Sequence, residues 1–162
     1  MEFGNSLFVA EQSDGFILDH ELLRECSPGD SKWLAQRLDQ IAAPSNGKLV
    51  GLFTDRGFPS RANERLLEEK GIFNGLCPRD PKVLCERLED EAFAAGQKRR
   101  AQTEARIGIL KNVFLEGTPR AKGFVNRQLA VSWGVLTQNL LLLARQPRAA
   151  AIAQAPPLAE AA

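Results

Sequence analysis

Three ionisable residues, Arg100, Glu104 and Lys111, are spaced so that a helix would place them on one stripe. At about 100° per residue, Glu104 lies roughly 40° around the helix from Arg100, and Lys111 lies roughly 20° from Glu104. The neighbouring sector is apolar and would face a core; it comprises Ile107, Leu110, Val113 and Phe114. The stripe is either a functional carboxylate flanked by two cations or the salt-bridged surface of an ordinary amphipathic helix.

A second candidate residue, Asp55, ends the nearly continuous apolar run Lys48–Thr54. An apolar run of this length between turn residues predicts a strand buried on both faces. The segment Arg56-Gly57-Phe58-Pro59 follows, and Ser60 can cap a helix that closes at Lys70-Gly71. A loop between a strand and the following helix is where open α/β sheets place functional groups. We therefore expect Asp55 at the edge of a sheet, in a position suited to chemistry.

The other expected elements complete an α/β domain with a mixed sheet. A cap at Asp30 or Ser31 is expected for the first helix, and Gly96 is expected to separate an acidic helix from the basic one. We expect a domain over residues 1–145 and a loose Ala/Pro-rich tail over 146–162. The elements are a hairpin of Ser6–Glu11 and Phe16–Leu22 across Ser13-Asp14-Gly15, helices at Lys32–Ala43, Val83–Ala95 and Arg127–Arg145, and a parallel strand at Ile72–Leu76.

Composition narrows the classes of protein. The chain has 162 residues, 44% hydrophobic and 25% charged, and a net charge of +1, which argues against a uniformly basic nucleic-acid binder. Positive charge is nevertheless concentrated: residues 98–127 hold eight basic residues and two acidic ones, a distribution that suits a polyanion. With three cysteines that show no CxxC spacing and a single histidine, His20, a zinc site or a disulfide framework is not expected. The sequence shows neither a signal peptide nor a membrane span, so we expect a soluble cytoplasmic protein.

Several short segments of the sequence together resemble those of the insertion-sequence transposases of the cut-and-paste DDE type. Their third acidic residue lies in the signature Tyr-x2-Arg-x3-Glu-x6-Lys, and Arg100, Glu104 and Lys111 match three of its four positions, with Gln97 in place of the tyrosine. Their second acidic residue ends a buried strand before Arg-Gly-Phe or Arg-Gly-Tyr, as Asp55 does here. The resemblance runs from residue 2 to about residue 145. It also includes Glu2-Phe3-Gly4-Asn5, Pro28-Gly29-Asp30-Ser31 and Trp133-Gly134-Val135-Leu136-Thr137-Gln138-Asn139-Leu140.

The resemblance implies a ribonuclease-H-like domain for DNA transposition, with a mixed sheet flanked by helices. It implies that Asp55 and Glu104 are catalytic ligands of two Mg²⁺ (or Mn²⁺) ions, one activating the attacking oxygen and the other stabilising the leaving oxygen. Arg100 and Lys111 would hold phosphates of the transposon-end DNA near these ions. The basic surround would add affinity that weakens with salt.

The resemblance also implies a departure from the family. The family's first catalytic aspartate lies on a central strand ahead of Glu-Phe-Gly, whereas this sequence starts Met1-Glu2-Phe3-Gly4. We expect that strand to be missing between the hairpin and the Lys48–Phe53 strand, so that either those two pair directly or a gap stays open to a partner. Asp14 and Asp19 are poor replacements for the aspartate by their expected places in the hairpin.

Three functions follow as alternatives. The chain is an N-terminally truncated transposase, inactive or nearly so alone. Alternatively, it is a non-catalytic DNA-binding or interaction remnant that associates with a full-length transposase, or an unrelated small α/β binding domain. An upstream reading frame could supply the aspartate through frameshifting.

Overall fold

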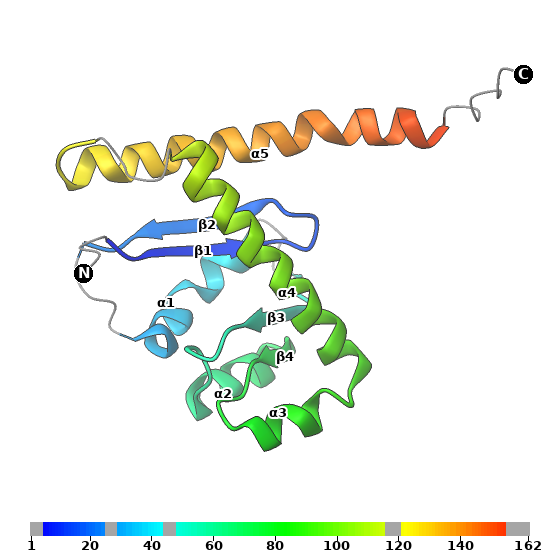
Figure 1. The fold of residues 1–162 in the computed structure, drawn as a ribbon. Helices are drawn as coiled ribbons and strands as arrows, with labels where there is room; N and C mark the ends of the chain where they lie inside the picture. The colour runs from blue at the N-terminus through cyan, green and yellow to red at the C-terminus, as the bar shows by residue number, and fades with distance from the viewer. Residues whose placement is uncertain (1–4, 25–28, 44–47, 116–120, 155–162) are drawn as a thin grey trace, which may run out of the picture.

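The computed structural model describes residues 5–24, 29–43, 48–115 and 121–154. It is a mixed α/β fold, as the sequence predicts (Figure 1). The elements in chain order are β1 (Leu7–Glu11), β2 (Ile17–Leu22), α1 (Asp30–Ala42), β3 (Gly51–Thr54), α2 (Arg61–Glu69), β4 (Phe73–Leu76), α3 (Pro81–Arg87), α4 (Glu91–Ile109), the π-helix η2 (Leu110–Phe114) and α5 (Phe124–Gln154).

The predicted hairpin is confirmed. Strands β1 and β2 pair antiparallel, with Leu7 opposite Leu22 and Val9 opposite His20. The turn needs a glycine, because Gly15 has φ 100°, a region that L side chains rarely adopt. The Asp14 carboxylate accepts a hydrogen bond of 3.3 Å from the Phe16 N–H and closes the turn locally.

Strands β3 and β4 are parallel, as predicted, and Thr54 lies opposite Leu76 at their C-terminal ends. The expectation that β3 is buried on both faces is confirmed only in part, because helices lie on both faces of the layer but most of the strand is half-buried. Only Thr54 of this strand is buried, and Val50 just before it is 83% exposed. The reason is that β3 pairs with β4 alone, so within the described part of the chain its second edge has no strand beside it.

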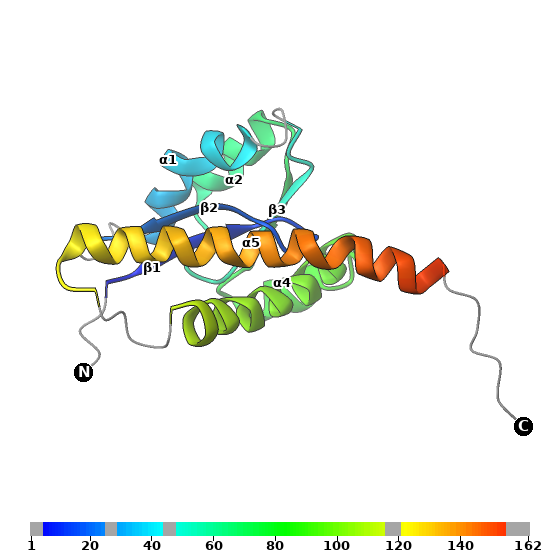
Figure 2. The same ribbon diagram turned by 90° about the horizontal axis from the view of Figure 1, so that it is seen from above.

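The two strand pairs lie in one layer but are separate two-stranded sheets. Helices α1 and α2 cover one face of this layer, α4 covers the other, and α5 lies along the β2 side (Figure 2). Phe8 and Ala10 of β1 and Leu52 of β3 pack on the same core under α1 and α2. This core comprises Leu34, Leu38, Ile41, Leu67, Ile72 and Leu76. A shared core thus holds together two sheets that no ladder of hydrogen bonds connects.

The caps of the helices differ in part from expectation. Ser60 caps α2 as predicted, accepting from the Asn63 N–H at 3.2 Å. For α1 the prediction is wrong: Gly29, with φ 100°, holds the N-cap position, and Asp30 is already the first helical residue. The expected boundary at Gly96 is also wrong, because the break falls between α3 and α4, where the Asp90 side chain caps α4 through the N–H groups of Ala92 and Phe93.

The C-terminal helices also depart from the predicted pattern. The last turn after α4 is the π-helix η2, which changes the angular spacing of its residues, and Val113 is 63% exposed instead of facing the core. Helix α5 continues to Gln154, beyond the end expected at Arg145; residues 155–162 of the expected tail lie outside the described residues. Its Val131 and Val135 are buried, whereas a row on the opposite face is 45–61% exposed: Leu129, Trp133, Leu136, Leu140 and Leu143. Each helix in the described ranges is too short or too polar to span a membrane.

Candidate active site

A cleft of about 580 Å³ lies where the ends of β3 and β4 meet α1, α3 and α4. Both carboxylates singled out in the sequence line it, although they are far apart along the chain. Arg100 lines it with them, as do residues to which the sequence assigned no chemistry. The polar side chains of the cleft are Asp30, Asp55, Arg56, Gln97, Arg100 and Glu104.

Asp55 enters the cleft on a tightly held loop directly after β3. One of its carboxylate oxygens accepts from the Gly57 N–H at 2.8 Å. The Arg79 guanidinium donates to the carbonyl oxygens of Arg56 (3.0 Å) and Gly57 (3.3 Å). The buried Asn63 amide donates to the Phe58 carbonyl at 2.8 Å. These bonds satisfy the backbone of the turn and fix the direction in which Asp55 leaves β3.

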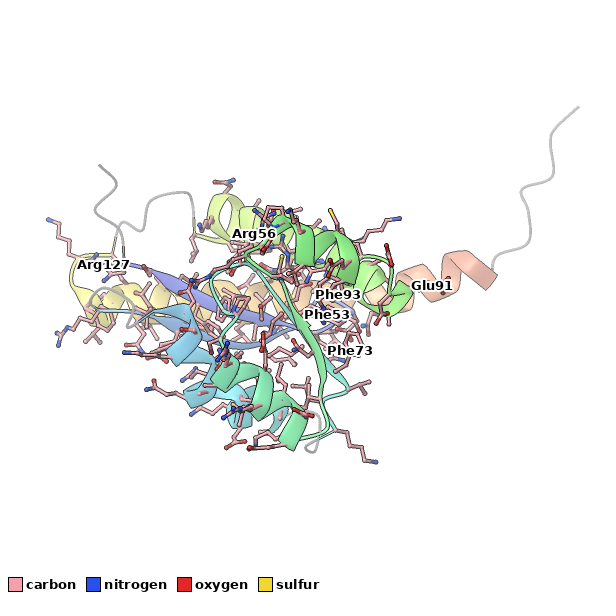
Figure 3. The ribbon with its side chains drawn as sticks, turned by 90° about the horizontal axis from the view of Figure 1, so that it is seen from below. Phe53, Arg56, Phe73, Glu91, Phe93 and Arg127 are labelled. Atoms are coloured by element: carbon pink, nitrogen blue, oxygen red, sulfur yellow. The ribbon has the colours of Figure 1, made fainter. Side chains whose placement is uncertain are left out.

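Glu104 and Arg100 reach the cleft because α4 packs very closely on β3 and β4. A Cβ atom at Gly96 would overlap the Phe53 ring, and one at Gly75 would overlap the same ring and the Leu52 carbonyl. Figure 3 shows the rings of Phe53, Phe73 and Phe93 gathered between these strands and α4. Phe93 is fully buried there. The two glycines therefore set the distance between α4 and the strands.

Gln97, which stands where the resembled signature has a tyrosine, fixes both the helix and Arg100. Its amide nitrogen donates to the Gly75 carbonyl of β4 at 2.9 Å. Its amide oxygen accepts from Arg100 Nε at 3.3 Å. A second nitrogen of Arg100 lies 2.8 Å from Glu104 Oε1. A chain of contacts thus runs from β4 through Gln97 and Arg100 to the Glu104 carboxylate.

The Arg100–Glu104 pair also fits the alternative interpretation of a salt-bridged helix surface. The two residues are four apart on one helix, and the Glu104 side chain is 66% exposed. Such a pair contributes only about 0.3–0.5 kcal/mol. The pairing alone therefore does not distinguish a structural role from a functional one. The position of Glu104 in the same cleft as Asp55 is the observation that favours a functional role.

Lys111 lies apart from this group. It is exposed in η2 and does not line the cleft. No ion pair engages its side chain among the residues that the structure describes. It is therefore available to a ligand that extends along α4 beyond the cleft.

The donor chemistry of the cleft suits a hard divalent ion, but the donor set is incomplete. Asp55 and Glu104 offer carboxylate oxygens, which Mg²⁺ prefers. Asp30, missed by the sequence reasoning because it was assigned to helix capping, adds a third carboxylate to the lining. Within the described ranges, however, no three such side chains are close enough to hold one ion. The residues present thus do not form a metal site by themselves.

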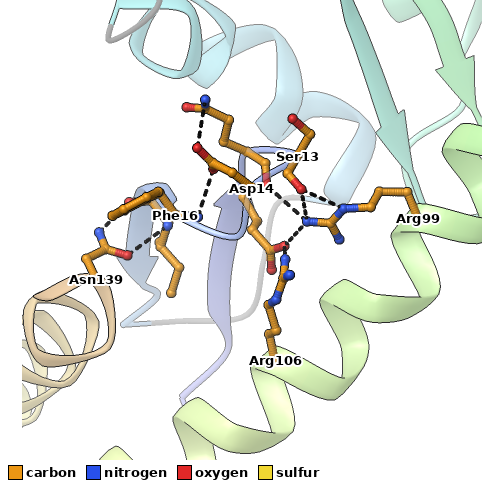
Figure 4. A network of polar contacts seen from close by, with 9 residues as sticks. Ser13, Asp14, Phe16, Arg99, Arg106 and Asn139 are labelled. Carbon is orange, nitrogen blue, oxygen red and sulfur yellow. Dashed lines mark hydrogen bonds and ion pairs between the residues drawn. The ribbon is translucent and has the colours of Figure 1, made fainter. Parts of the chain in front are cut away.

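The basic run contributes less free charge than its sequence suggests. Arg99 and Arg106 both form ion pairs with Glu11, whose side chain is only 2% exposed. Arg99 also donates to the Ser13 carbonyl in the hairpin turn, and this network ties α4 to the hairpin (Figure 4). These two arginines therefore position α4 and are not open to a polyanion.

On the β2 side, His20 contacts Ser132 of α5, with 3.0 Å between Nε2 and Oγ. Burial lowers the pKa of His20 below its ordinary value; nearby Asp19 raises the pKa and Arg37 lowers it further. This histidine joins two elements of the fold and does not line the cleft.

No protein-family model, curated protein or solved structure matches this chain.

Proposed function

We propose that this chain is part of the catalytic domain of a DDE transposase, acting in DNA cleavage and strand transfer. The observation that carries the proposal is that Asp55 and Glu104, 49 positions apart in the sequence, line one cleft together with Arg100. A cytoplasmic, nucleoid-associated location in a bacterium follows from the same proposal.

The arrangement of the strands supports a ribonuclease-H-like fold that lacks its central strand. The hairpin and the β3–β4 pair share a core and a layer, yet β1 and β3 are not joined by a ladder. All five residues of β1 are only half-buried as whole residues, although the Glu11 side chain is enclosed and helices cover both faces of the layer. In the resembled fold the central strand pairs with the counterparts of β1 and β3. A partner strand in this place would satisfy both free edges.

In the proposed site, Asp55 and Glu104 would be two of the ligands of Mg²⁺ or Mn²⁺, which would supply charge stabilisation for the attacking and leaving oxygens. Arg100, oriented by Gln97, holds a DNA phosphate beside the cleft, and Lys111 holds another further along α4. Because the carboxylates of the cleft form no three-ligand cluster among the described residues, we propose that this chain alone binds DNA without transferring strands. A full-length transposase or an upstream-frame product would then complete the site.

The alternative is a non-catalytic DNA-binding remnant that joins a full-length transposase. Two observations favour it: the Glu104 carboxylate is paired with Arg100, and the described residues contain no three-ligand cluster. The two functions differ in what a supplied complement would do. Activity restored by an added upstream segment would favour the first, and continued inactivity with intact DNA binding would favour the second.

The test combines a strand-transfer assay with DNA binding. The purified 162-residue chain, given a DNA end and Mg²⁺ or Mn²⁺, should yield no joined product. Robust strand transfer would refute the proposal that its catalytic site is incomplete. Substituting both Arg100 and Lys111 by Ala should weaken binding and reduce the salt slope, log Kobs against log[salt], by up to about 1.8 for two duplex phosphate contacts. An unchanged slope would remove both residues from the DNA contact. The matched control is Arg65→Ala, an exposed arginine on α2 outside the cleft.

A further inference from the structure

Arg56 is a cation of the cleft whose charge no other described side chain neutralises. The residue is exposed and lines the cleft at the end of β3, beside α4 (Figure 3). In the described part of the chain, its guanidinium takes part in neither a hydrogen bond nor an ion pair. Arg100, the other arginine of the cleft, is paired with Glu104 at 2.8 Å.

The backbone that carries Arg56 is fixed, although its side chain is free. Arg79 donates to the carbonyl oxygens of Arg56 and Gly57, and the Asp55 carboxylate holds the Gly57 N–H. A fixed backbone lowers the entropy that is lost when a side chain becomes ordered on a ligand. The loop therefore presents one guanidinium without a polar partner among the described residues from a preorganised support.

The charges of the cleft make this cation matter for an anionic ligand. Three carboxylates, those of Asp30, Asp55 and Glu104, line it and repel phosphate. The positive charge of Arg100 is neutralised by its contact with Glu104, so Arg56 is the cation that attracts an anionic ligand. Its planar fork matches two phosphate oxygens. Resting on the proposed function, we infer that Arg56 binds a DNA phosphate at the cleft and contributes more to DNA affinity than Arg100.

The test measures binding of a fluorescently labelled DNA duplex to the 162-residue chain by anisotropy between about 50 and 200 mM KCl. Over these concentrations phosphate contacts dominate the salt dependence, and each contact contributes about one unit to the slope of log Kobs against log[salt]. Arg56→Gln should lower the slope by about 0.9 and raise Kd about three- to tenfold, whereas Arg56→Lys should keep the slope. Arg100→Gln should change both less than Arg56→Gln does. Arg65→Gln on α2 is the matched control and should bind like the parent chain.

Each result decides one point. Parental affinity and slope in Arg56→Gln would refute the phosphate contact, and a larger loss in Arg100→Gln would refute the ranking. If the parent chain bound no DNA, the proposed function would fall along with the inference, whereas losses confined to Arg100→Gln would leave that function standing. Thermal unfolding of Arg56→Gln should match the parent; a lowered midpoint would contradict the finding that the side chain has no partner.

Discussion

Substituting Gly96 by Ala tests whether the approach of α4 to the strands builds the cleft. A Cβ atom at this position would overlap the Phe53 ring. That ring cannot turn aside freely, because it packs on Phe73 with 5.7 Å between centroids and lies against Gly75. Helix α4 must therefore shift outward, and the Gln97 amide would then leave the Gly75 carbonyl.

The expected magnitude is a balance of three terms. Alanine favours a helix over glycine by about 0.8–1 kcal/mol. Overpacking costs about 1–3 kcal/mol, and loss of the Gln97 hydrogen bond costs about 0.5–1.5 kcal/mol. The net result is a destabilisation of about 0.5–3.7 kcal/mol. Gly108 lies on the same helix, and apart from its chain neighbours and the helix backbone no heavy atom lies within 4 Å of its would-be Cβ, so Gly108→Ala should instead stabilise by up to about 1 kcal/mol.

The assay is urea unfolding of the parent and both variants, followed by circular dichroism. The free energy of unfolding should fall in Gly96→Ala and rise or stay level in Gly108→Ala. The thermal midpoints of the two variants should differ by at least about 1–2 °C for a chain of this size. If Gly96→Ala were as stable as Gly108→Ala, α4 would not lie against Phe53, and the cleft that joins Asp55 to Glu104 would lose its support.

Two further predictions concern the contacts around the cleft and the hairpin. Glu11→Ala should lower the free energy of unfolding by more than about 2 kcal/mol, because it leaves Arg99 and Arg106 without their buried partner. Glu11→Gln should lower it less, because the amide oxygen can still accept a hydrogen bond from these arginines. Equal losses in the two variants would contradict that role for the side-chain oxygen. The lowered pKa of His20 means that the unfolded chain binds more protons near the ordinary value of about 6.5, so its contribution to stability is present above that pH and is lost as the pH falls toward the folded pKa. Thermal midpoints from pH 7.5 to 5.5 should therefore fall more steeply for the parent than for His20→Gln, and parallel curves would refute the linkage.

Local signals in the sequence predict the local structure well. Asp14-Gly15 predicts the hairpin because glycine alone readily takes the backbone angles of that turn. Ser60 predicts the start of α2 through its hydroxyl, and the apolar run before Asp55 predicts a strand, although one shorter and less buried than expected.

The mistakes arise where a contact distant in the sequence decides the outcome. Gly96 reads as a helix boundary, yet it lies inside α4 because Phe53 requires the space. Asp30 reads as a cap, yet it reaches the cleft because α1 starts beside the loop after β3. The charge of Arg99 looks available until Glu11 is seen to bind it. The spacing of residues along the chain does not reveal contacts of this kind. The roles of Asp55, Glu104, Arg100 and Lys111 remain predictions.

Gly96 also bears on the choice between a salt-bridged surface and a functional stripe. A helix that only covers a sheet would be more stable with alanine in its middle, by about 0.8–1 kcal/mol. Here the helix instead has a glycine at the point of closest approach, followed directly by Gln97, which bonds to β4. Glu104 lies eight residues further on, about 12 Å along the axis, and lines the same cleft as Asp55. Because a Cβ atom at position 96 would overlap the Phe53 ring, glycine is the more stable residue in this packing, and the close docking that it permits fixes where Glu104 lies relative to Asp55, as a shared site would require.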